Sequence, residues 1–188
     1  MKTKPTTSTG ELPRERGSSE EAWPKPLPFQ LRRIVVPMDF SDTSKKALQY
    51  AVPFAVAFDA EMLLVHVVQP FSLPSELGYM PPEIMGDQQA FRESAQVQLN
   101  KLCAAELGAR CRYQVQVREG VPWQEVVNAA TESEADLIIL ATHGRTGLSH
   151  VLLGSVAERV MRHGPCPVLV VRERERDFTP ATSNAVSA

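Results

Sequence analysis

Cysteine, aromatic residues and long apolar runs are all scarce in this sequence. Only three cysteines occur among 188 residues, an odd number without C-x-x-C spacing, so we expect neither a structural disulfide nor a four-ligand zinc site. This cysteine usage favours a reducing, cytoplasmic location. The longest apolar stretches, such as residues 137–141, are far below the roughly 18 residues that a membrane helix needs.

An excess of charge of one sign is also missing. The formal net charge is -2, from 20 Lys and Arg against 22 Asp and Glu, which argues against nucleic acid or a membrane surface as a partner. Residues 1–28 lack the continuous apolar core of an export signal, so we do not expect a signal peptide.

The distribution of apolar residues predicts one domain with two tails. Residues 1–28 hold five prolines and few apolar residues, and we expect a disordered N-terminal extension there. Residues 173–188 begin with charged residues and end in small ones, which predicts a flexible C-terminal tail. The segment 29–172 is long enough for one core, since a domain of about 140 residues buries roughly two-thirds of its unfolded surface.

Within this segment, short apolar runs alternate with longer stretches of helical periodicity. The runs are residues 34–36, 62–68, 113–117, 137–140 and 168–171. Nearly continuous apolar strands separated by helices predict an α/β fold: a single doubly wound, five-stranded parallel sheet with helices on both faces, Rossmann-like in architecture. In such sheets ligands bind beyond the carboxyl ends of the strands, which here are residues 37–39, 67–68 and 141–144.

The most informative stretch, residues 141–155, leaves a buried strand and enters a helix at Gly154 and Ser155. It carries two further glycines, Gly144 and Gly147. Glycines allow close approach of a phosphate, and a helix start supplies unpaired N–H groups, so the stretch predicts a phosphate cradle. A tight strand-to-helix turn without a ligand is the alternative. The chain has neither G-x-G-x-x-G nor G-x-x-x-x-G-K-[ST], which disfavours an ordinary NAD enzyme and a P-loop ATPase.

Several blocks, in the same order, resemble the universal stress protein (UspA) family. They are residues 34–41 (IVVPMDFS), 64–67 (LVHV), 142–148 (THGRTGL), 153–160 (LGSVAERV) and 165–171 (PCPVLVV). The resemblance covers residues 31 to 172, and it implies the fold of the adenine nucleotide alpha hydrolase-like proteins. It also implies a homodimer that pairs through the last strand, an apolar strand that we expect at a sheet edge.

The family has an ATP-binding branch marked by Gly, two residues, Gly, nine residues, then Gly-Ser or Gly-Thr. Here Ala141 replaces the first glycine, and its methyl group either crowds the nucleotide or is accommodated by a small shift. The resemblance implies ATP with Mg²⁺ as the ligand. Asp39 would contact the ribose, the Val67 backbone the adenine edge, and Leu140 with Ala141 the nucleoside.

The phosphates would meet Gly144, Arg145, Gly154, Ser155 and Val156. Pro37, Met38, His143 and Gly147 complete the expected binding set. For Asp39, a helix-capping acid is a compatible reading. For His143, orienting the turn is as plausible as touching a phosphate. His66, in mid-strand, is expected to be a hydrogen-bonded core histidine.

The resemblance implies a stress-response protein that binds ATP in a regulatory role, and with no obvious acid/base pair near the loop we expect at most weak ATPase activity. The alternative is a dimeric interaction protein that does not bind nucleotide, which the alanine at position 141 favours. A true hydrolase or transferase acting on a nucleotide is a third class, and it would require rapid turnover that depends on Asp39.

Overall fold

The computed structural model describes residues 30–69, 88–142, 154–173, 175 and 176. Its elements are β1 (Arg33–Pro37), α1 (Asp42–Phe58), β2 (Glu61–Val68), α2 (Gln88–Glu106), β3 (Tyr113–Glu119), α3 (Pro122–Glu132), β4 (Leu137–Ala141), α4 (Ser155–His163) and β5 (Val168–Val171). The strands form one sheet in the order β3-β2-β1-β4-β5, and every pairing is parallel. The predicted five-stranded parallel α/β fold is confirmed.

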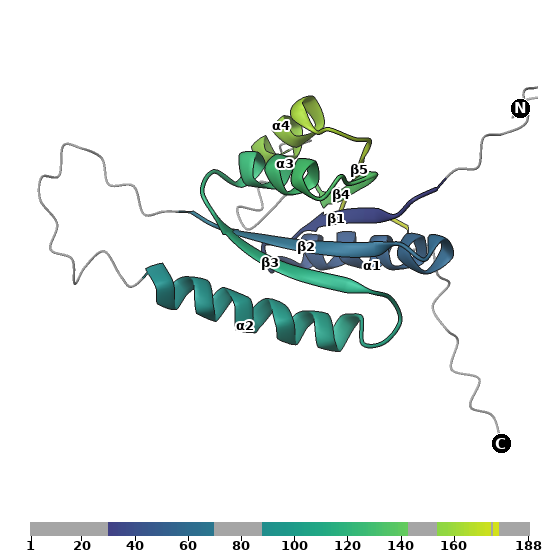
Figure 1. Ribbon diagram of the computed structural model, residues 1–188. Helices are drawn as coiled ribbons and strands as arrows, with labels where there is room; N and C mark the ends of the chain where they lie inside the picture. The colour runs from purple at the N-terminus through teal and green to yellow at the C-terminus, as the bar shows by residue number, and fades with distance from the viewer. Residues whose placement is uncertain (1–29, 70–87, 143–153, 174, 177–188) are drawn as a thin grey trace, which may run out of the picture.

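The helices form two layers around the sheet, with α1 and α2 on one face and α3 and α4 on the other (Figure 1). Alternate side chains of each strand enter opposite cores, as the two-residue period of a strand requires. Ile34, Val36 and Leu64 pack with α1 and α2. Val35 and Val65 pack with α3 and α4. The sheet therefore separates two apolar cores, and this alternation decides which side chains reach which side of the site.

Strand order reverses beside β1, where the chain passes from β2 and β3 on one side to β4 and β5 on the other. This switch point leaves a crevice at the carboxyl ends of β1 and β4, because the following connections diverge to opposite faces. β5 lies at an edge of the sheet, as expected from the sequence. Among the described helices, none has both the length and the apolar character needed to cross a membrane.

The first residues of the expected C-terminal tail contact α1. Lys46 donates from Nζ to the carbonyl oxygen of Glu173 at 3.0 Å, and the Tyr50 hydroxyl donates to the carbonyl oxygen of Arg176. The expected N-terminal extension, residues 1–28, and residues 177–188 of the tail lie outside the described part of the chain. The predicted domain boundaries therefore stay predictions.

Candidate functional site

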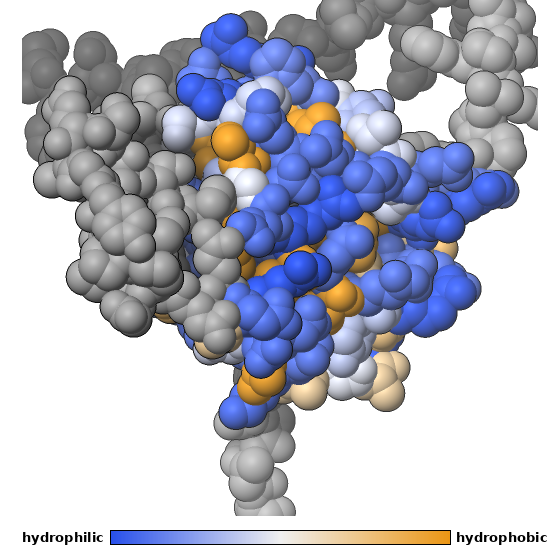
Figure 2. All heavy atoms as spheres, turned by 60° about the vertical axis from the view of Figure 1, so that its left-hand side comes forward, coloured by the Kyte–Doolittle hydropathy of each residue, from blue (hydrophilic) through white to orange (hydrophobic). Residues whose placement is uncertain are grey.

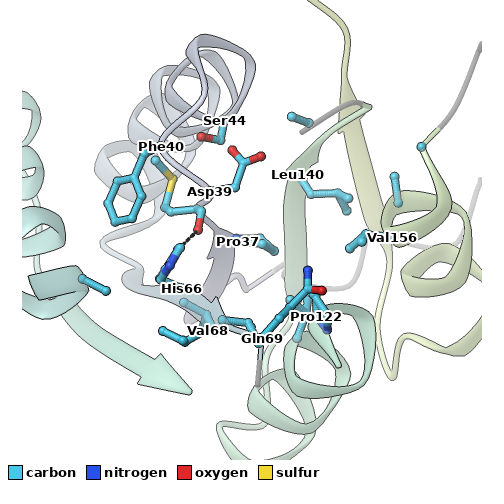
Figure 3. A pocket seen from close by; sticks show the side chains of 18 of the residues that line it. Pro37, Asp39, Phe40, Ser44, His66, Val68, Gln69, Pro122, Leu140 and Val156 are labelled. Carbon is cyan, nitrogen blue, oxygen red and sulfur yellow. Dashed lines mark hydrogen bonds between the residues drawn. The ribbon is translucent and has the colours of Figure 1, made fainter. Parts of the chain in front are cut away.

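A cavity of about 920 Å³ lies beyond the carboxyl ends of β1, β2 and β4 (Figure 3). It is lined by nine of the residues proposed from the sequence: Pro37, Met38, Asp39, Val67, Leu140, Ala141, Gly154, Ser155 and Val156. The remaining four, His143, Gly144, Arg145 and Gly147, lie outside the described residues. The structure thus places the described candidates around one cavity, while their contacts with a ligand stay a prediction.

The cavity extends over both sides of the sheet. Figure 3 shows Phe40, Ser44 and His66 on one side, and Leu140, Val156 and Pro122 on the other. Val67 packs with the core beneath α3 and α4, so it belongs to the second side. Figure 2 turns the carboxyl ends of the strands toward the viewer. On this face, hydrophobic residues are visible between the hydrophilic residues of the described surface.

The first turn of α4 forms one wall of the cavity. Gly154 is the N-cap, and its N–H donates to the carbonyl oxygen of Thr142 at 2.7 Å. The first bond within the helix runs from Glu158 N–H to the Gly154 carbonyl at 3.0 Å, so the N–H groups of Ser155, Val156 and Ala157 precede the helical ladder. All three residues line the cavity. Unpaired N–H groups at the positive end of a helix dipole attract an anion.

Asp39 lies where β1 passes into α1. Its Oδ1 accepts from the Ser41 N–H at 3.1 Å and from the Ser41 hydroxyl at 2.5 Å. Ser41 is itself the N-cap of α1, because its Oγ accepts from the Ser44 N–H at 3.2 Å. Asp39 therefore orients the capping residue and does not cap the helix directly. A carboxylate at this position can accept hydrogen bonds from the hydroxyl groups of a ligand.

Val67 extends past the end of β1. In β2 the odd-numbered residues bond to β1, as shown by Glu61 N–H to the Arg32 carbonyl at 2.8 Å and Met38 N–H to the Val65 carbonyl at 2.8 Å. The next bond of this ladder would join Val67 N–H to the Met38 carbonyl, and it is absent from the described residues. The N–H and C=O of Val67 therefore point toward the cavity beyond β1.

His66 bonds to the same carbonyl oxygen that the missing ladder bond would have used. Its Nδ1 lies 2.7 Å from the carbonyl oxygen of Met38, and its ring centroid lies 4.5 Å from that of Phe40. A carbonyl oxygen only accepts, so Nδ1 carries the proton. The sequence-based expectation of a hydrogen-bonded histidine agrees with this contact. His66 also lines the cavity, which the reasoning from sequence did not anticipate.

The wall formed by α3 depends on a glycine and a largely buried ion pair. Gly120 has φ = +146°, and a Cβ there would lie 3.0 Å from Cγ of Glu125, so a larger residue would strain the turn into the helix. Arg118 on β3 lies 3.2 Å from the Glu125 carboxylate, and their side chains are only 13% and 21% exposed. These contacts fix the first turn of α3, which places Pro122 and Val126 in the cavity wall.

Four residues of α2, none of them among the site residues expected from the sequence, also reach the cavity: Phe91, Ser94, Ala95 and Gln98. Phe91 is 60% exposed, which is unusual for a large apolar side chain. Their spacing of three and four residues puts them on one helical face. That periodicity was visible in the sequence, but it does not predict that this face of α2 lies next to the carboxyl ends of the strands.

Comparison with known proteins gives the context of this cavity. The sequence profile of the universal stress protein family matches residues 30–172. The chain belongs to this family. Universal stress protein MJ0531 of Methanocaldococcus jannaschii is 40% identical over 151 residues, which cover 78% of this chain and 85% of that protein. The predicted resemblance is therefore confirmed at the level of the family.

Solved universal stress protein structures share the fold of this universal stress protein. The structure of MJ0577, also from M. jannaschii, has a TM-score of 0.67 and 29% identity, and the match covers 79% of this chain and all of that one. A universal stress protein solved in complex with cAMP has a TM-score of 0.55 and 24% identity, and the match covers 77% and 98% of the two chains. The second likeness shows the fold alone.

The alanine that this universal stress protein carries at position 141 lines the cavity from the α1 side of the sheet. Ala141 packs against the core formed with α1 and α2, whereas its neighbour Leu140 packs with α3 and α4. The alternation along β4 therefore directs the methyl group into the α1 side of the sheet. The methyl group of Ala141 and the side chain of Leu140 therefore lie on opposite faces of β4.

The described part of the cavity wall has few charges. Asp39 and His66 are its only titratable side chains among the described residues. No group of three or more His, Cys, Asp or Glu side chains that could hold a metal ion occurs in that part of the chain. The three cysteines do not contribute to the described wall, and burial raises the pKa of each, that of Cys103 to about 11. A reactive thiolate is not a feature of this site.

Proposed function

We propose that this universal stress protein binds ATP, with Mg²⁺ on its phosphates, in the cavity at the carboxyl ends of β1, β2 and β4. The observation that carries the proposal is that two sets of backbone groups, for which the described residues offer no backbone partner, lie at the same end of the sheet. The first-turn N–H groups of α4 suit phosphate oxygens. The N–H and C=O of Val67 offer one donor beside one acceptor, the pattern that complements the N1 and N6 edge of adenine.

The remaining lining residues fit the parts between base and phosphates. Pro37, Val126 and Leu140 supply apolar contacts for the nucleoside. The Asp39 carboxylate suits a ribose hydroxyl better than a phosphate, because two anions repel each other. Ala141 directs its methyl group into the α1 core, which supports binding in spite of the altered motif.

Mg²⁺ would be held mainly by the phosphates and by water. Magnesium commonly keeps several water ligands and takes one or two carboxylates together with substrate phosphates. Asp39 is the one carboxylate in the described part of the wall, so a cage made only of protein ligands is not expected there.

The proposed role is regulatory, with slow hydrolysis at most. Rapid hydrolysis needs a group that positions or activates water. In the described wall only Asp39 and His66 could do this; Oδ1 of Asp39 is engaged by Ser41 and Nδ1 of His66 by the Met38 carbonyl, so Oδ2 of Asp39 and Nε2 of His66 are the atoms that a test of hydrolysis must address. Rapid turnover that disappears in Asp39→Ala would instead support a hydrolase or transferase.

Ligand-dependent stability tests the proposal. A ligand that binds only the folded state at a free concentration of 100 times its Kd stabilises the protein by about 2.7 kcal/mol. Thermal unfolding with Mg-ATP should therefore show a concentration-dependent increase in Tm, and inorganic tripolyphosphate with Mg²⁺ should give a smaller increase. Native mass spectrometry of the same sample would count bound nucleotides. The absence of a shift at millimolar Mg-ATP would contradict the proposal and favour the dimeric interaction protein.

We also propose that two copies pair through β5. Ile138 N–H bonds to the Pro167 carbonyl at 3.0 Å, and Thr142 N–H bonds to the Val171 carbonyl at 2.9 Å. With the parallel register of β4 and β5, this pattern turns the backbone groups of Val168 and Val170 away from β4. An apolar edge strand with outward N–H and C=O groups favours pairing with a second strand. Light scattering that shows a stable monomer would contradict it.

A further inference from the structure

We propose that His66 is a positioning residue for the nucleobase, because it ends the β1–β2 ladder one bond early and so leaves the Val67 backbone open to a ligand. The inference rests on the proposed function in its statement about the base. Its structural part, the competition between His66 and Val67 for one carbonyl oxygen, is independent of any ligand.

The register identifies the bond that His66 replaces. Pro37 of β1 is aligned with Val65 of β2, and Met38 N–H donates to the Val65 carbonyl. In a parallel ladder, the residue that donates to one carbonyl of the neighbouring strand accepts from the N–H two residues further along that strand. The next bond after Met38 N–H to the Val65 carbonyl would therefore run from Val67 N–H to the Met38 carbonyl. In the described residues that carbonyl accepts from Nδ1 of His66 at 2.7 Å.

The other edge of β2 does not use the Val67 groups. Even-numbered residues of β2 bond to β3, as shown by Met62 N–H to the Arg112 carbonyl at 3.0 Å and Gly120 N–H to the Val68 carbonyl at 3.1 Å. Val67 therefore faces β1, at a level where β1 has already ended at Pro37. A buried or half-buried donor and acceptor without a strand partner gain from pairing with a ligand.

Two contacts hold the His66 ring in its place. The hydrogen bond to Met38 fixes one edge, and the Phe40 ring packs at a centroid distance of 4.5 Å and an interplanar angle of 40°. Phe40 reaches this position with φ = +66°, a left-handed conformation that is unusual for a bulky residue. Figure 3 shows both rings beside the end of β1, with the dashed line running from His66 to the carbonyl oxygen.

The consequence is a selectivity for the base. Val67 N–H can donate to N1 of adenine, and its C=O can accept from the N6 amino group. Hypoxanthine, the base of ITP, has a proton on N1 and an oxygen at position 6. The Val67 N–H would then face the N1–H donor, and the Val67 C=O would face the O6 acceptor, so neither hydrogen bond could form. A site with fixed polar groups rejects such a mismatch strongly. The protein should therefore prefer ATP to ITP by about tenfold or more.

Three proteins separate the role of the donor from the role of the ring. His66→Phe keeps an aromatic ring beside Phe40 but has no donor, so the Met38 carbonyl is no longer held toward residue 66 and can turn to accept from Val67. His66→Asn retains an amide donor in a place similar to Nδ1 and loses the ring. The wild-type chain is the reference, and His66→Leu is a further donor-free variant should the phenylalanine disturb packing.

The first measurement is amide hydrogen exchange at Val67 without nucleotide. We expect the Val67 N–H to exchange quickly in the wild type and in His66→Asn. In His66→Phe it should be protected by about tenfold or more, because it then donates to Met38. Equal exchange in the wild type and His66→Phe would overturn the inference, even if both proteins bind ATP.

The second measurement is the ratio of the affinities for ATP and ITP. We expect a high ratio in the wild type and in His66→Asn, and a ratio close to one in His66→Phe. A changed exchange rate with an unchanged ratio would refute the recognition of the base by Val67. Failure of the wild type to bind either nucleotide would refute the proposed function, while the exchange measurement would still decide the role of His66.

Discussion

A negative charge at the first position of α4 should affect stability and nucleotide binding in opposite directions. Ser155 directly follows the N-cap Gly154, is exposed, and lines the cavity. In Ser155→Asp the new carboxylate lies at the positive end of the helix dipole, which stabilises a folded protein by about 0.3 to 1 kcal/mol. The same carboxylate would stand where we propose that the phosphates bind.

The expected loss of affinity follows from the charges. Two unit charges about 4 Å apart interact by roughly 1 kcal/mol in water and about 4 kcal/mol near a protein surface. The repulsion therefore weakens ATP binding by about 5- to 800-fold. At an ATP concentration of 100 times the wild-type Kd, a 100-fold loss reduces the ligand stabilisation from about 2.7 to about 0.4 kcal/mol.

The assay is thermal unfolding with and without Mg-ATP. For a domain of this size about 1 kcal/mol corresponds to roughly 3 to 5 °C in Tm. We expect Ser155→Asp to unfold at a slightly higher temperature than the wild type without ligand and to show little shift with ATP. Ser155→Asn, a neutral residue of the same shape, should retain most of the shift.

A matched control places the same type of charge on another helix. Gln124 is exposed in the first turn of α3 and is not part of the described cavity wall. Gln124→Glu should stabilise the free protein in the same way and leave the ATP shift unchanged. If Ser155→Asp retained the full shift with ATP, the phosphates could not lie at the start of α4.

Three further changes test the fold, the pairing of subunits and the buried thiol. Val170→Pro removes an N–H that points away from β4, so it should convert the proposed dimer into a monomer in light scattering without unfolding it; a dimer that persists would exclude pairing through β5. Leu99→Ala should cost about 2 to 5 kcal/mol in chemical denaturation, because Leu99 is fully buried, whereas Val97→Ala on the exposed face should cost less than about 0.5 kcal/mol. Burial raises the pKa of Cys103 from 9.0 to about 11, so the folded state retains a proton that the unfolded state loses, and the free energy of unfolding should fall as the pH rises from 9 to 11. Cys103→Ala should flatten that decrease, and an unchanged slope would contradict the assignment.

The fold was predictable because each strand corresponds to a short apolar run in the sequence. Runs such as residues 62–68 and 137–140 are buried by helices on both faces of a parallel sheet, so they need no alternation of polar residues. The apolar pattern does not determine the order of the strands in the sheet. That order depends on which face of the sheet each helix packs against, and this cannot be inferred from the sequence of any one segment.

The candidate site was predictable to the extent that it follows strand ends. Asp39 and Val67 lie at the ends of predicted strands and Ser155 at the start of a predicted helix, and the structure brings all three to one cavity. The direction of the Ala141 methyl group could not be predicted, because it depends on the register between β4 and its neighbours. The contributions of α2, through Phe91 and Gln98, depend on how that helix crosses the sheet.

His66 shows most clearly why the site could not be predicted in full from local sequence patterns. The sequence places it among apolar residues, which correctly suggested a hydrogen-bonded side chain. Its partner is a backbone carbonyl 28 residues away, and the effect of the bond falls on a third group, the Val67 N–H. Such an effect appears only when the ladder of β1 and β2 is followed bond by bond.

The cavity itself follows from unequal strand lengths. β1 ends at Pro37, aligned with Val65, while β2 continues to Val68 and retains its pairing with β3 as far as Glu119. The extra residues of β2 are therefore satisfied on one edge only, and their other edge faces the crevice at the switch point. In most sheets such an edge is covered or solvated, because open backbone groups invite unwanted pairing. Here Nδ1 of His66 bonds to the Met38 carbonyl, one residue past the end of β1, and in our proposal this bond keeps the edge of β2 open for a ligand.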